Sequence, residues 1–291
     1  MKISVIIPTY NRAALLGEAL ESVLRQKVDA ELDVVVVDDG STDDTANVLS
    51  NYADVSQLRV FTQPNSGQSA ARDRGVNESD GELVCFLDSD NRWKPGKLDR
   101  QLDVMRNNPE IGVIYGDNEL IDLKGKVVGK MQMKRYSGWI TRQLLADNFV
   151  NFNTSMVRRE CIEKAGGFDP SVRIGDDYDL WLRISVHCKF LYVPEIWAEY
   201  RVEGDRISGN KDARLESNRK TLNRFLSAHP KIATSSVRSF ANASFYTRRG
   251  NHRAATGRLL LAGLDYLRAL SYRPWDCRPW RGLIRSALLR R

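Results

Sequence analysis

Two aspartates separated by a single residue follow a short apolar segment of the chain. Residues 83–87 are all apolar, and Asp88, Ser89 and Asp90 come directly after them. An apolar run of this length is typical of a strand buried on both faces of a parallel sheet. Carboxylates at its end are costly unless a cation or hydrogen-bond donors compensate them, and hard divalent cations prefer oxygen ligands. The spacing indicates either a metal site or acids that cap a helix starting near Pro95.

Two other apolar segments also end in polar residues. Residues 3–7 lead into a polar segment at 8–12, and residues 34–37 lead into Asp38 and Asp39. Ligands of open α/β sheets bind at the carboxyl ends of parallel strands, where these segments would lie along one edge. Three polar strand ends therefore favour a binding site over a set of helix caps.

Helical patterns separate the predicted strands. Apolar residues recur at steps of three and four over residues 14–24. A second helical segment, 69–76, lies between a strand near 58–61 and the strand that ends at Leu87. This alternation of strands and helices predicts an α/β fold with a doubly wound, mostly parallel sheet flanked by helices.

The second half of the chain divides into a mixed part and a helical part. The mixed part predicts a hairpin at 119–128, strands at 152–157, 191–193 and 196–200, and helices at 159–165 and 176–186. From residue 212 onward the pattern is mostly helical, with breaks at Pro230, Gly250 and 274–279. We therefore divide the chain into an α/β domain at residues 1–210 and a basic, mostly helical C-terminal region at residues 211–291.

Composition limits the class of protein. The chain has 291 residues, of which 42% are hydrophobic, enough for a sizeable core. No apolar run is long enough to predict a transmembrane helix, and the N-terminus does not resemble a signal peptide. Cys85 is expected in the sheet core, while Cys161, Cys188 and Cys277 show no paired spacing and are expected as reduced thiols. The cytoplasm is the expected compartment.

Charge is distributed unevenly along the chain. Residues 230–291 contain 13 Lys or Arg and only 2 acids, which gives a net charge of +11, although the whole chain carries +7. Such a segment suggests an acidic partner, and an amphipathic helix starting near Pro279, with Trp275 and Trp280 nearby, favours a membrane surface over nucleic acid. The alternative is a helical bundle that packs on the α/β domain with its arginines in water; both can hold at once.

Five segments resemble motifs of family 2 glycosyltransferases. They occur in the expected order, and the resemblance covers roughly residues 2–208. The segments are SVIIPTYN at 4–11, VDDGSTD at 37–43, SGQSAARDRG at 66–75, DSD at 88–90 and GDDYDLWLR at 175–183. The resemblance implies the GT-A fold, a nucleotide-binding α/β domain with an Asp-x-Asp metal motif.

The resemblance also implies an activity. It suggests inverting, non-processive transfer of one sugar from a nucleotide-diphosphate sugar, with UDP favoured, as in the synthesis of bacterial surface polysaccharides. The acceptor would be a hydroxyl of a saccharide or lipid-linked saccharide. A lipid-linked acceptor would explain peripheral contact of residues 230–291 with an anionic membrane, on the inner face of the cell membrane.

Roles for individual residues follow from the matching positions. Asp177, with Asp176 beside it, matches the general base, and Asp90 with Asp88 would hold Mg²⁺ or Mn²⁺ on the donor diphosphate. The residues implied in nucleotide-sugar binding are Pro8, Thr9, Tyr10, Asn11, Asp39, Arg72, Asp88 and Ser89.

The chain departs from the family pattern at three positions. A metal-binding His that many members carry is replaced by Glu203, which we treat as a candidate third metal ligand. Asp176 stands where Glu is usual, so the register between Asp176 and Asp177 stays open. Asp73 stands where Asn is usual. The chain has neither the Gln-x-x-Arg-Trp motif nor the membrane spans of processive synthases, which favours single-sugar addition.

Other classes of function fit less well. A catalytically inactive, nucleotide-binding and membrane-associated scaffold of the same fold is the main alternative, although the Asp-x-Asp and base positions are intact. Specific nucleic-acid binding is not expected. Any polybasic segment binds nucleic acid in a salt-dependent way, so only sequence- or structure-selective binding would support that function. A dinucleotide oxidoreductase is disfavoured, because no Gly-x-Gly-x-x-Gly follows the first strand.

Overall fold

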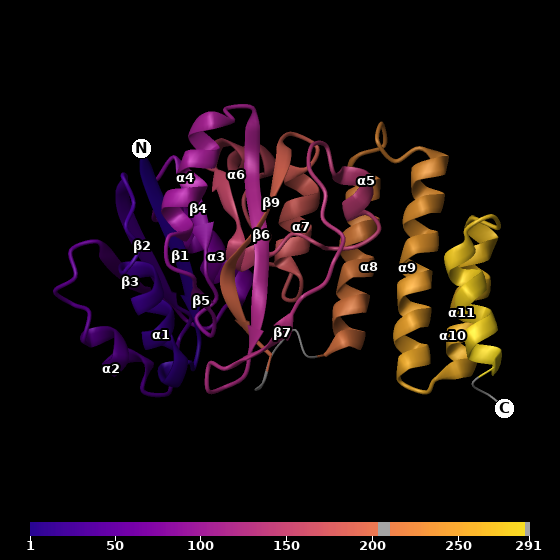
Figure 1. Cartoon of the computed structure of the whole chain (residues 1–291), viewed down its shortest axis with the longest axis horizontal. Coiled ribbons are helices and arrows are strands. Elements are labelled where there is room, and N and C mark those ends of the chain that lie inside the picture. The colour runs from indigo at the N-terminus through magenta and orange to yellow at the C-terminus, as the bar shows by residue number, and fades with distance from the viewer. Residues whose placement is uncertain (203–209, 289–291) are drawn as a thin grey trace. The chain divides into compact units, whose positions relative to one another are not determined.

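The structure is a computed structural model that describes residues 1–202 and 210–288. The chain divides into two compact units (Figure 1). The sheet unit comprises Met1–Ile140 and Phe149–Arg206, and the helical unit comprises Thr141–Asn148 and Ile207–Arg291. The predicted α/β domain and C-terminal helices are thus both present, and the domain boundary at residue 210 stays a prediction.

The sheet unit alternates strands and helices in its first half, as the apolar pattern predicts. This part contains β1 (Lys2–Thr9), α1 (Ala13–Leu24), β2 (Glu31–Asp38), α2 (Thr45–Ser50), β3 (Leu58–Thr62), α3 (Gln68–Asn77), β4 (Leu83–Phe86), β5 (Arg92–Trp93) and α4 (Lys97–Asn107). The second half contains β6 (Ile111–Ile121), β7 (Val127–Lys130), the 3₁₀ turn η1 (Phe152–Thr154), β8 (Met156–Arg158), α6 (Arg159–Ala165), α7 (Asp176–Ile184) and β9 (Lys189–Arg201).

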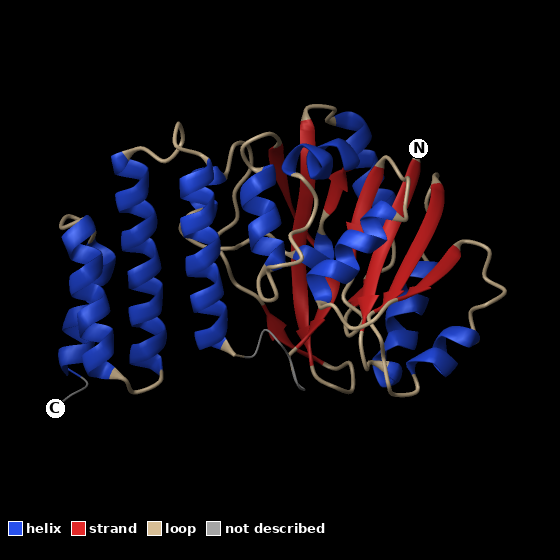
Figure 2. Cartoon of the chain, turned by 180° about the vertical axis from the view of Figure 1, so that it is seen from behind, coloured by secondary structure: helices blue, strands red, loops and turns tan. Residues whose placement is uncertain are grey.

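One mixed sheet organises this unit, with its strands in the order β3-β2-β1-β4-β8-β6-β9-β5 and β7 paired with β6. The strands β3, β2, β1 and β4 are parallel neighbours, and β6 and β9 are parallel as well. Antiparallel β8 joins the two parallel groups, because it pairs with β4 on one side and β6 on the other. Helices flank the strands (Figure 2). The predicted α/β fold with a mostly parallel, helix-flanked sheet is confirmed.

Apolar runs form the central strands because both of their faces are covered. Val34 to Val37 on β2 are fully buried, and so are Leu83 to Phe86 on β4. Helix α1 contributes Leu16, Leu20 and Val23 to the same core. These side chains remove a continuous apolar surface from water, the main favourable term in folding.

The structure differs from the sequence expectations in its short elements. The strand predicted at 152–157 is the η1 turn followed by the short β8, and the two strands predicted between 191 and 200 form the single strand β9. The strand β5 was not predicted, because its two residues acquire extended pairing only through Glu199 and Ala198 of β9.

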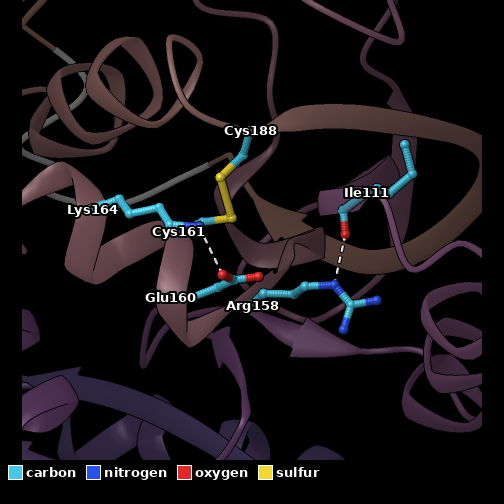
Figure 3. Close-up of a disulfide and its surroundings, with 6 residues drawn as sticks. All are labelled: Ile111, Arg158, Glu160, Cys161, Lys164 and Cys188. Carbon is cyan, nitrogen blue, oxygen red and sulfur yellow. Dashed lines mark hydrogen bonds and ion pairs between the residues drawn. A yellow bond between two sulfur atoms is a disulfide. The ribbon is translucent and has the colours of Figure 1, made fainter.

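A disulfide joins Cys161 to Cys188, so the expectation that both are reduced thiols is wrong (Figure 3). Cys161 lies on α6 and Cys188 directly precedes β9, and the fold brings them together over Gly112 of β6. A β-carbon on Gly112 would lie 2.3 Å from the Cys161 sulfur, so only glycine leaves room for the bond. Spacing along the chain could not reveal this pairing. Cys85 is buried in β4 as expected, and Cys277 is an exposed free thiol.

The helical unit contains α5 (Thr141–Leu144), α8 (Lys211–Ala228), α9 (Ser235–Ala255), α10 (Leu259–Tyr272) and α11 (Cys277–Leu288). Helices α9, α10 and α11 pack against one another, and α8 contacts α9. Within residues 1–202 and 210–288, no helix combines the length and apolar character needed to cross a membrane.

Candidate nucleotide-sugar site

Three parallel strands bring the predicted polar segments to one edge of the sheet. The Thr9 position at the end of β1 pairs with Asp38 of β2, and Ile6 of β1 pairs with Phe86 of β4. Because β1 lies between β2 and β4, the segments that follow all three strands are neighbours. The edge predicted from sequence therefore exists.

Asn11 connects the segments that follow β1 and β2. Its backbone has φ +50°, a conformation that Asn tolerates better than most residues. The Asn11 side-chain oxygen accepts a hydrogen bond from the backbone N–H of Thr42 at 2.8 Å, and its own N–H donates to Ser41 Oγ. Pro8 and Thr9 before it are buried, whereas Tyr10 is 44% exposed. Asn11 therefore fixes the loop, and Tyr10 is the side chain of this segment that a ligand can reach.

Asp39 organises the loop before α3. Its Oδ1 accepts hydrogen bonds from the Ser66 N–H at 2.9 Å and from Gln63 Nε2 at 2.7 Å, and its Oδ2 accepts from the Gly67 N–H at 2.8 Å. An ionised carboxylate has about four acceptor sites, so three are already used. Asp39 is buried, and the protein itself fixes its orientation.

Arg72 of α3 lies at the centre of the site. Its NH2 lies 2.5 Å from Asp88 Oδ1 and its NH1 lies 2.6 Å from Asp176 Oδ2. The guanidinium carbon stands 4.0 Å from the centroid of the Phe152 ring, a cation–π contact. Burial alone would lower the pKa of Arg72, but Asp176 and Asp88 raise it above its ordinary value, so the group stays charged. Arg72 thus joins two predicted site acids.

Asp88 has further partners on both sides. Its carboxylate accepts hydrogen bonds from Gln68 Nε2 and Asn153 Nδ2, each at 3.1 Å, and its N–H donates to Asn153 Oδ1 at 2.7 Å. Asn153 is itself held in place, because Trp93 Nε1 donates to the Asn153 carbonyl. The orientation of Asp88 is therefore fixed by α3 and by the η1 turn.

The remainder of the Asp-x-Asp segment is anchored by Arg201 at the end of β9. Ser89 is buried and Asp90 is half-buried. Arg201 is 1% exposed, and its Nε donates to the Asp90 carbonyl at 2.9 Å while its N–H donates to Asn91 Oδ1. The end of β9 therefore meets the Asp88–Asp90 segment. Glu203 follows Arg201 in the sequence but lies outside the described residues.

Three acids begin helix α7, where the N-terminal backbone dipoles favour negative charge. Asp176 is 4% exposed and pairs with Arg72, and Asp179 pairs with Arg183 at 2.7 Å. Asp177 is half-buried. The three acids therefore differ in accessibility, and Asp177 is the most accessible to a substrate.

Asp73 does not lie in the Arg72 cluster, although it is the next residue on α3. Its carboxylate accepts hydrogen bonds from the Phe168 N–H at 3.0 Å and from Asn77 Nδ2. Burial raises its pKa, while the Phe168 contact opposes that rise. Asp73 stabilises the turn after α6, where Gly166 and Gly167 have positive φ.

The carboxylates of the Asp-x-Asp segment suit a divalent ion that enters the site together with the substrate diphosphate. Across residues 1–202 and 210–288, no cluster of three or more His, Cys, Asp or Glu side chains is preformed as a metal site. Mg²⁺ is commonly held by one or two carboxylates together with substrate phosphates, and Asp88 and Asp90 offer that number. Their residue types fit the ion, with a diphosphate supplying the other oxygens.

Several residues of this site were not identified from the sequence. Asn153, Gln68 and Arg201 each hold part of the Asp88–Asp90 segment. Asn153 gave no distinct signal, because Asn151, Thr154 and Ser155 beside it are polar as well. Gln68 lies within the matched segment 66–75 and Arg201 two residues before Glu203, but neither was assigned a role from the sequence, because their partners lie far away in the chain.

The chain resembles known glycosyltransferases in sequence. Residues 4–164 match the family model described as glycosyl transferase family 2. The chain is 33% identical over 213 residues to an uncharacterised glycosyltransferase of Nostoc sp., covering 70% of this chain and 66% of that protein. It is 30% identical to the putative teichuronic acid biosynthesis glycosyltransferase TuaG of Bacillus subtilis, covering 72% and 82%.

Other relatives are longer, and the structural similarity supports the fold. Escherichia coli chondroitin synthase is 29% identical to this chain. The alignment covers 77% of this chain but only 32% of the synthase. Among the relatives, the chain spans 66% of the Nostoc protein and 30% of a Rickettsia felis glycosyltransferase. The S. aureus TarS structure 1–349 in complex with UDP-GlcNAc superposes with a TM-score of 0.66 at 18% identity, covering 99% and 92%. The chain belongs to glycosyl transferase family 2 and carries a glycosyltransferase domain of the GT-A fold.

Proposed function

We propose that the protein transfers a single sugar, with inversion, from a nucleotide-diphosphate sugar to a hydroxyl of a saccharide or lipid-linked saccharide. The observation that carries this proposal is the double ion pair of Arg72, which brings Asp88 and the start of α7 into one site. The same cation contacts Asp88, in the proposed leaving-group site, and Asp176, which directly precedes the proposed base Asp177. The similarity to TuaG, a putative teichuronic acid biosynthesis glycosyltransferase, supports a role in surface-polysaccharide synthesis. The TarS structures in complex with UDP-GlcNAc and with UDP support a UDP-sugar donor.

Donor binding is assigned to the strand-end segments. The exposed Tyr10 ring is available to stack on the base, and Pro8, Thr9, Asn11, Asp39 and Ser89 would shape the nucleotide pocket around it. Asp90 and Asp88 would hold Mg²⁺ or Mn²⁺, a Lewis acid on the departing diphosphate. Glu203 remains the proposed third ligand. Arg72 would stabilise the site as a fixed positive charge between Asp88 and Asp176.

Asp177 is the proposed general base. The acceptor hydroxyl would give its proton to the Asp177 carboxylate as its oxygen bonds to the anomeric carbon, and the bond from that carbon to the diphosphate oxygen would break. A single displacement of this kind inverts the anomeric centre. Asp176 is less suited to the role, because its carboxylate is buried against Arg72. A positioned base contributes about 10²- to 10⁴-fold to such a step.

The proposed location is cytoplasmic, on the inner face of the cell membrane, where a lipid-linked acceptor would be met. Cytosolic disulfides are rare, because cellular reductants keep thiols reduced. The redox state of Cys161 and Cys188 in freshly lysed cells therefore tests this location, and a fully oxidised pair would argue against it.

A donor screen tests the transferase assignment. A ligand that binds only the native state raises its thermal stability, so UDP-, GDP- and dTDP-sugars are compared by thermal shift with and without Mn²⁺. We expect a Mn²⁺-dependent shift with a UDP-sugar, and release of UDP on incubation with saccharide acceptors. A shift without any release of nucleotide, by hydrolysis or by transfer, would favour the inactive scaffold instead. No shift with any donor would contradict nucleotide-sugar binding.

A further inference from the structure

Helix α11 packs in an unusual orientation, with its small residues inward. Its buried residues are Pro279 and Ser286, and Gly282 lies between them on the same face. A β-carbon on Gly282 would lie 2.4 Å from Cζ of Tyr266 on α10, so the helix backbone rests directly on that ring. The rotation of α11 about its axis is therefore fixed by a contact that a larger residue could not make.

The Tyr266 ring is held from a second side as well. A β-carbon on Gly250 of α9 would lie 2.7 Å from Cε1 of the ring, and the Tyr266 hydroxyl donates to Asn251 Oδ1 at 2.9 Å. Glycines of α9 and α11 thus enclose one aromatic side chain of α10. The three helices form a defined packing unit in which α11 cannot turn its large residues inward.

Six large apolar residues of α10 and α11 face the solvent. On α10, Leu260, Leu264 and Leu267 are 70%, 62% and 56% exposed, and on α11, Trp280, Ile284 and Leu288 are 49%, 61% and 66% exposed. We call these six residues the apolar stripe. Within each helix they recur at steps of three or four, so each set lies on one face, and the two helices contact one another. Large apolar side chains exposed along a helix face in this way indicate an interaction site.

Positive charge surrounds the apolar stripe. Arg281 and Arg285 on α11 are exposed, and within the described part of the chain no carboxylate pairs with either one. The two acids of residues 230–291 are neutralised nearby, since Asp265 pairs with Arg249 and Arg253, and Asp276 pairs with Arg278. Arg281 and Arg285 therefore leave positive charge beside the α11 part of the stripe.

We infer that the apolar stripe inserts into an anionic lipid bilayer and holds the α10–α11 hairpin flat on its surface. An amphipathic helix gains free energy there from burial of its apolar face and from attraction of its arginines to lipid headgroups. Trp280, with Nε1 bonded to the Pro274 carbonyl, and the 73% exposed Trp275 present rings suited to the headgroup level. The inference names the partner of the helical unit and is independent of the transfer chemistry.

A second copy of the chain is a weaker occupant for this surface. Two identical stripes placed face to face would bring Arg281 and Arg285 of both copies together, and like charges without acids between them repel. An anionic bilayer removes the apolar residues from water and compensates the same arginines. Charge therefore favours lipid over self-association.

Vesicle co-sedimentation of the full chain tests the inference. The vesicles contain phosphatidylcholine alone or with about one third phosphatidylglycerol, at about 0.05 M and about 0.5 M salt. We expect binding to the anionic vesicles that weakens as salt rises. Leu264→Ser combined with Ile284→Ser should weaken binding at least about ten-fold, because two exposed side chains lose their apolar burial. Arg281→Gln combined with Arg285→Gln should weaken it and reduce its salt dependence.

Matched controls separate the stripe from general surface chemistry. Val127→Ser combined with Val128→Ser removes two exposed apolar side chains from β7, and Lys220→Gln combined with Lys231→Gln removes two exposed charges from elsewhere in the helical unit. Both controls should bind vesicles like the wild type. Hydrolysis of the nucleotide-sugar donor should be unchanged in all four double variants. Unchanged hydrolysis would show that the sheet unit is intact, so that a loss of vesicle binding is separate from any loss of enzyme activity.

Three results would overturn the inference. The first is no binding of the wild type to anionic vesicles at low salt. The second is unchanged binding by the Leu264 and Ile284 variant, which would mean electrostatic adhesion without insertion. The third is a concentration-dependent dimer in size-exclusion chromatography that the same variant abolishes, which would assign the stripe to a second copy.

Discussion

Arg72 NH1 and Asp176 Oδ2 lie 2.6 Å apart although 104 residues separate them in sequence, and both side chains are almost completely buried. The second amino group of the same guanidinium contacts Asp88. Burying charges is costly, and it is tolerated here because the cation is shared by two carboxylates and stacks on Phe152. The ion pair therefore fixes the start of α7 against the Asp-x-Asp segment.

This arrangement assigns different tasks to neighbouring acids. Asp176 compensates a buried charge, whereas the more accessible Asp177 follows it by one residue on the same helical turn. A base must reach the acceptor hydroxyl, and the Asp176 carboxylate is buried against Arg72. The geometry therefore favours Asp177 for the chemical step.

Asp177→Asn should retain donor binding and lose transfer by about 10²- to 10⁴-fold. The loss corresponds to about 3 to 5 kcal/mol of transition-state stabilisation. Initial rates at saturating donor, together with donor affinity from thermal shift, provide the measurement.

Asp176→Asn is the matched control for that variant. It removes one of the two charges that compensate Arg72, and breaking a buried pair costs about 3 to 5 kcal/mol, the lower end being expected because Asp88 remains. We therefore expect a lower free energy of unfolding by denaturant titration. An Asp176→Asn protein of normal stability without transfer, beside an active Asp177→Asn protein, would reverse the two assignments.

Metal removal should abolish transfer. EDTA is expected to eliminate activity, and added Mn²⁺ or Mg²⁺ should restore it, because the departing diphosphate needs a Lewis acid. Asp90→Asn should weaken metal-dependent nucleotide binding while leaving the thermal stability of the free protein unchanged, since this half-buried residue lies at a strand end.

Glu203→Ala extends this test to the proposed third ligand. It should raise the metal concentration that gives half-maximal activity. Full activity in EDTA would refute the metal assignment altogether, whereas an unchanged metal titration of the Glu203 variant would remove only that residue from the ligand set.

Buried Lys97 on α4 should make folding stability rise at alkaline pH. Its Nζ lies 2.6 Å from Gln101 Oε1 and 3.7 Å from the centroid of the Trp93 ring, with no exposed surface. Burial lowers its pKa from the ordinary value of 10.5 to about 8. Between these two pH values Lys97 is protonated in the unfolded chain but neutral in the folded chain, so the free energy of unfolding increases with pH. Below about pH 8 Lys97 is charged in both states, and the full cost of burying its charge lowers the stability of the folded protein.

Comparison with Lys97→Met isolates this contribution. From pH 7 to 9.5 the free energy of unfolding of the wild type should rise by about 2 kcal/mol relative to the variant. Urea titrations at several pH values measure the difference, in which the titration of groups that do not interact with Lys97 cancels; Cys85 is the neighbour that does interact with it. Parallel curves for the two proteins would mean that Trp93 and Gln101 keep Lys97 charged in the folded state.

The sequence predicts those parts of the fold that depend on local pattern. The buried runs of β1, β2 and β4 and the helices between them follow from apolar periodicity, and the polar strand ends follow from residue type. The short elements η1, β5 and β8 are different, because tertiary contacts such as the bond from Trp93 to the Asn153 carbonyl determine them. Local propensity is too weak in such short segments to predict them.

The partners within the site also lie beyond what a single sequence reveals. Residue types at motif positions identified Asp88 and Arg72, but not that the two form an ion pair. The Cys161–Cys188 bond was missed for the same reason, since the room for it is provided by Gly112 on a third element. Contacts between distant residues depend on the complete packing of the sheet.

Two glycines of the helical unit should respond to alanine in opposite directions. Gly263 of α10 has open space where a β-carbon would stand, so Gly263→Ala should stabilise the protein by about 0.5 to 1 kcal/mol through helix propensity. On Gly282 of α11 the same atom would lie 2.4 Å from the Tyr266 ring. Tyr266 cannot yield, because Gly250 closes its other side, and overpacking costs about 1 to 3 kcal/mol. Gly282→Ala should therefore destabilise the protein despite its better propensity.

Denaturant titrations followed by far-ultraviolet circular dichroism measure both changes. The test concerns the orientation of α11, because only the packing that turns Trp280, Ile284 and Leu288 outward brings Gly282 onto the ring. If Gly282→Ala stabilises the protein as much as Gly263→Ala does, α11 does not rest on Tyr266. The outward orientation of its apolar residues would then lose its structural basis, and so would the proposed contact with the bilayer.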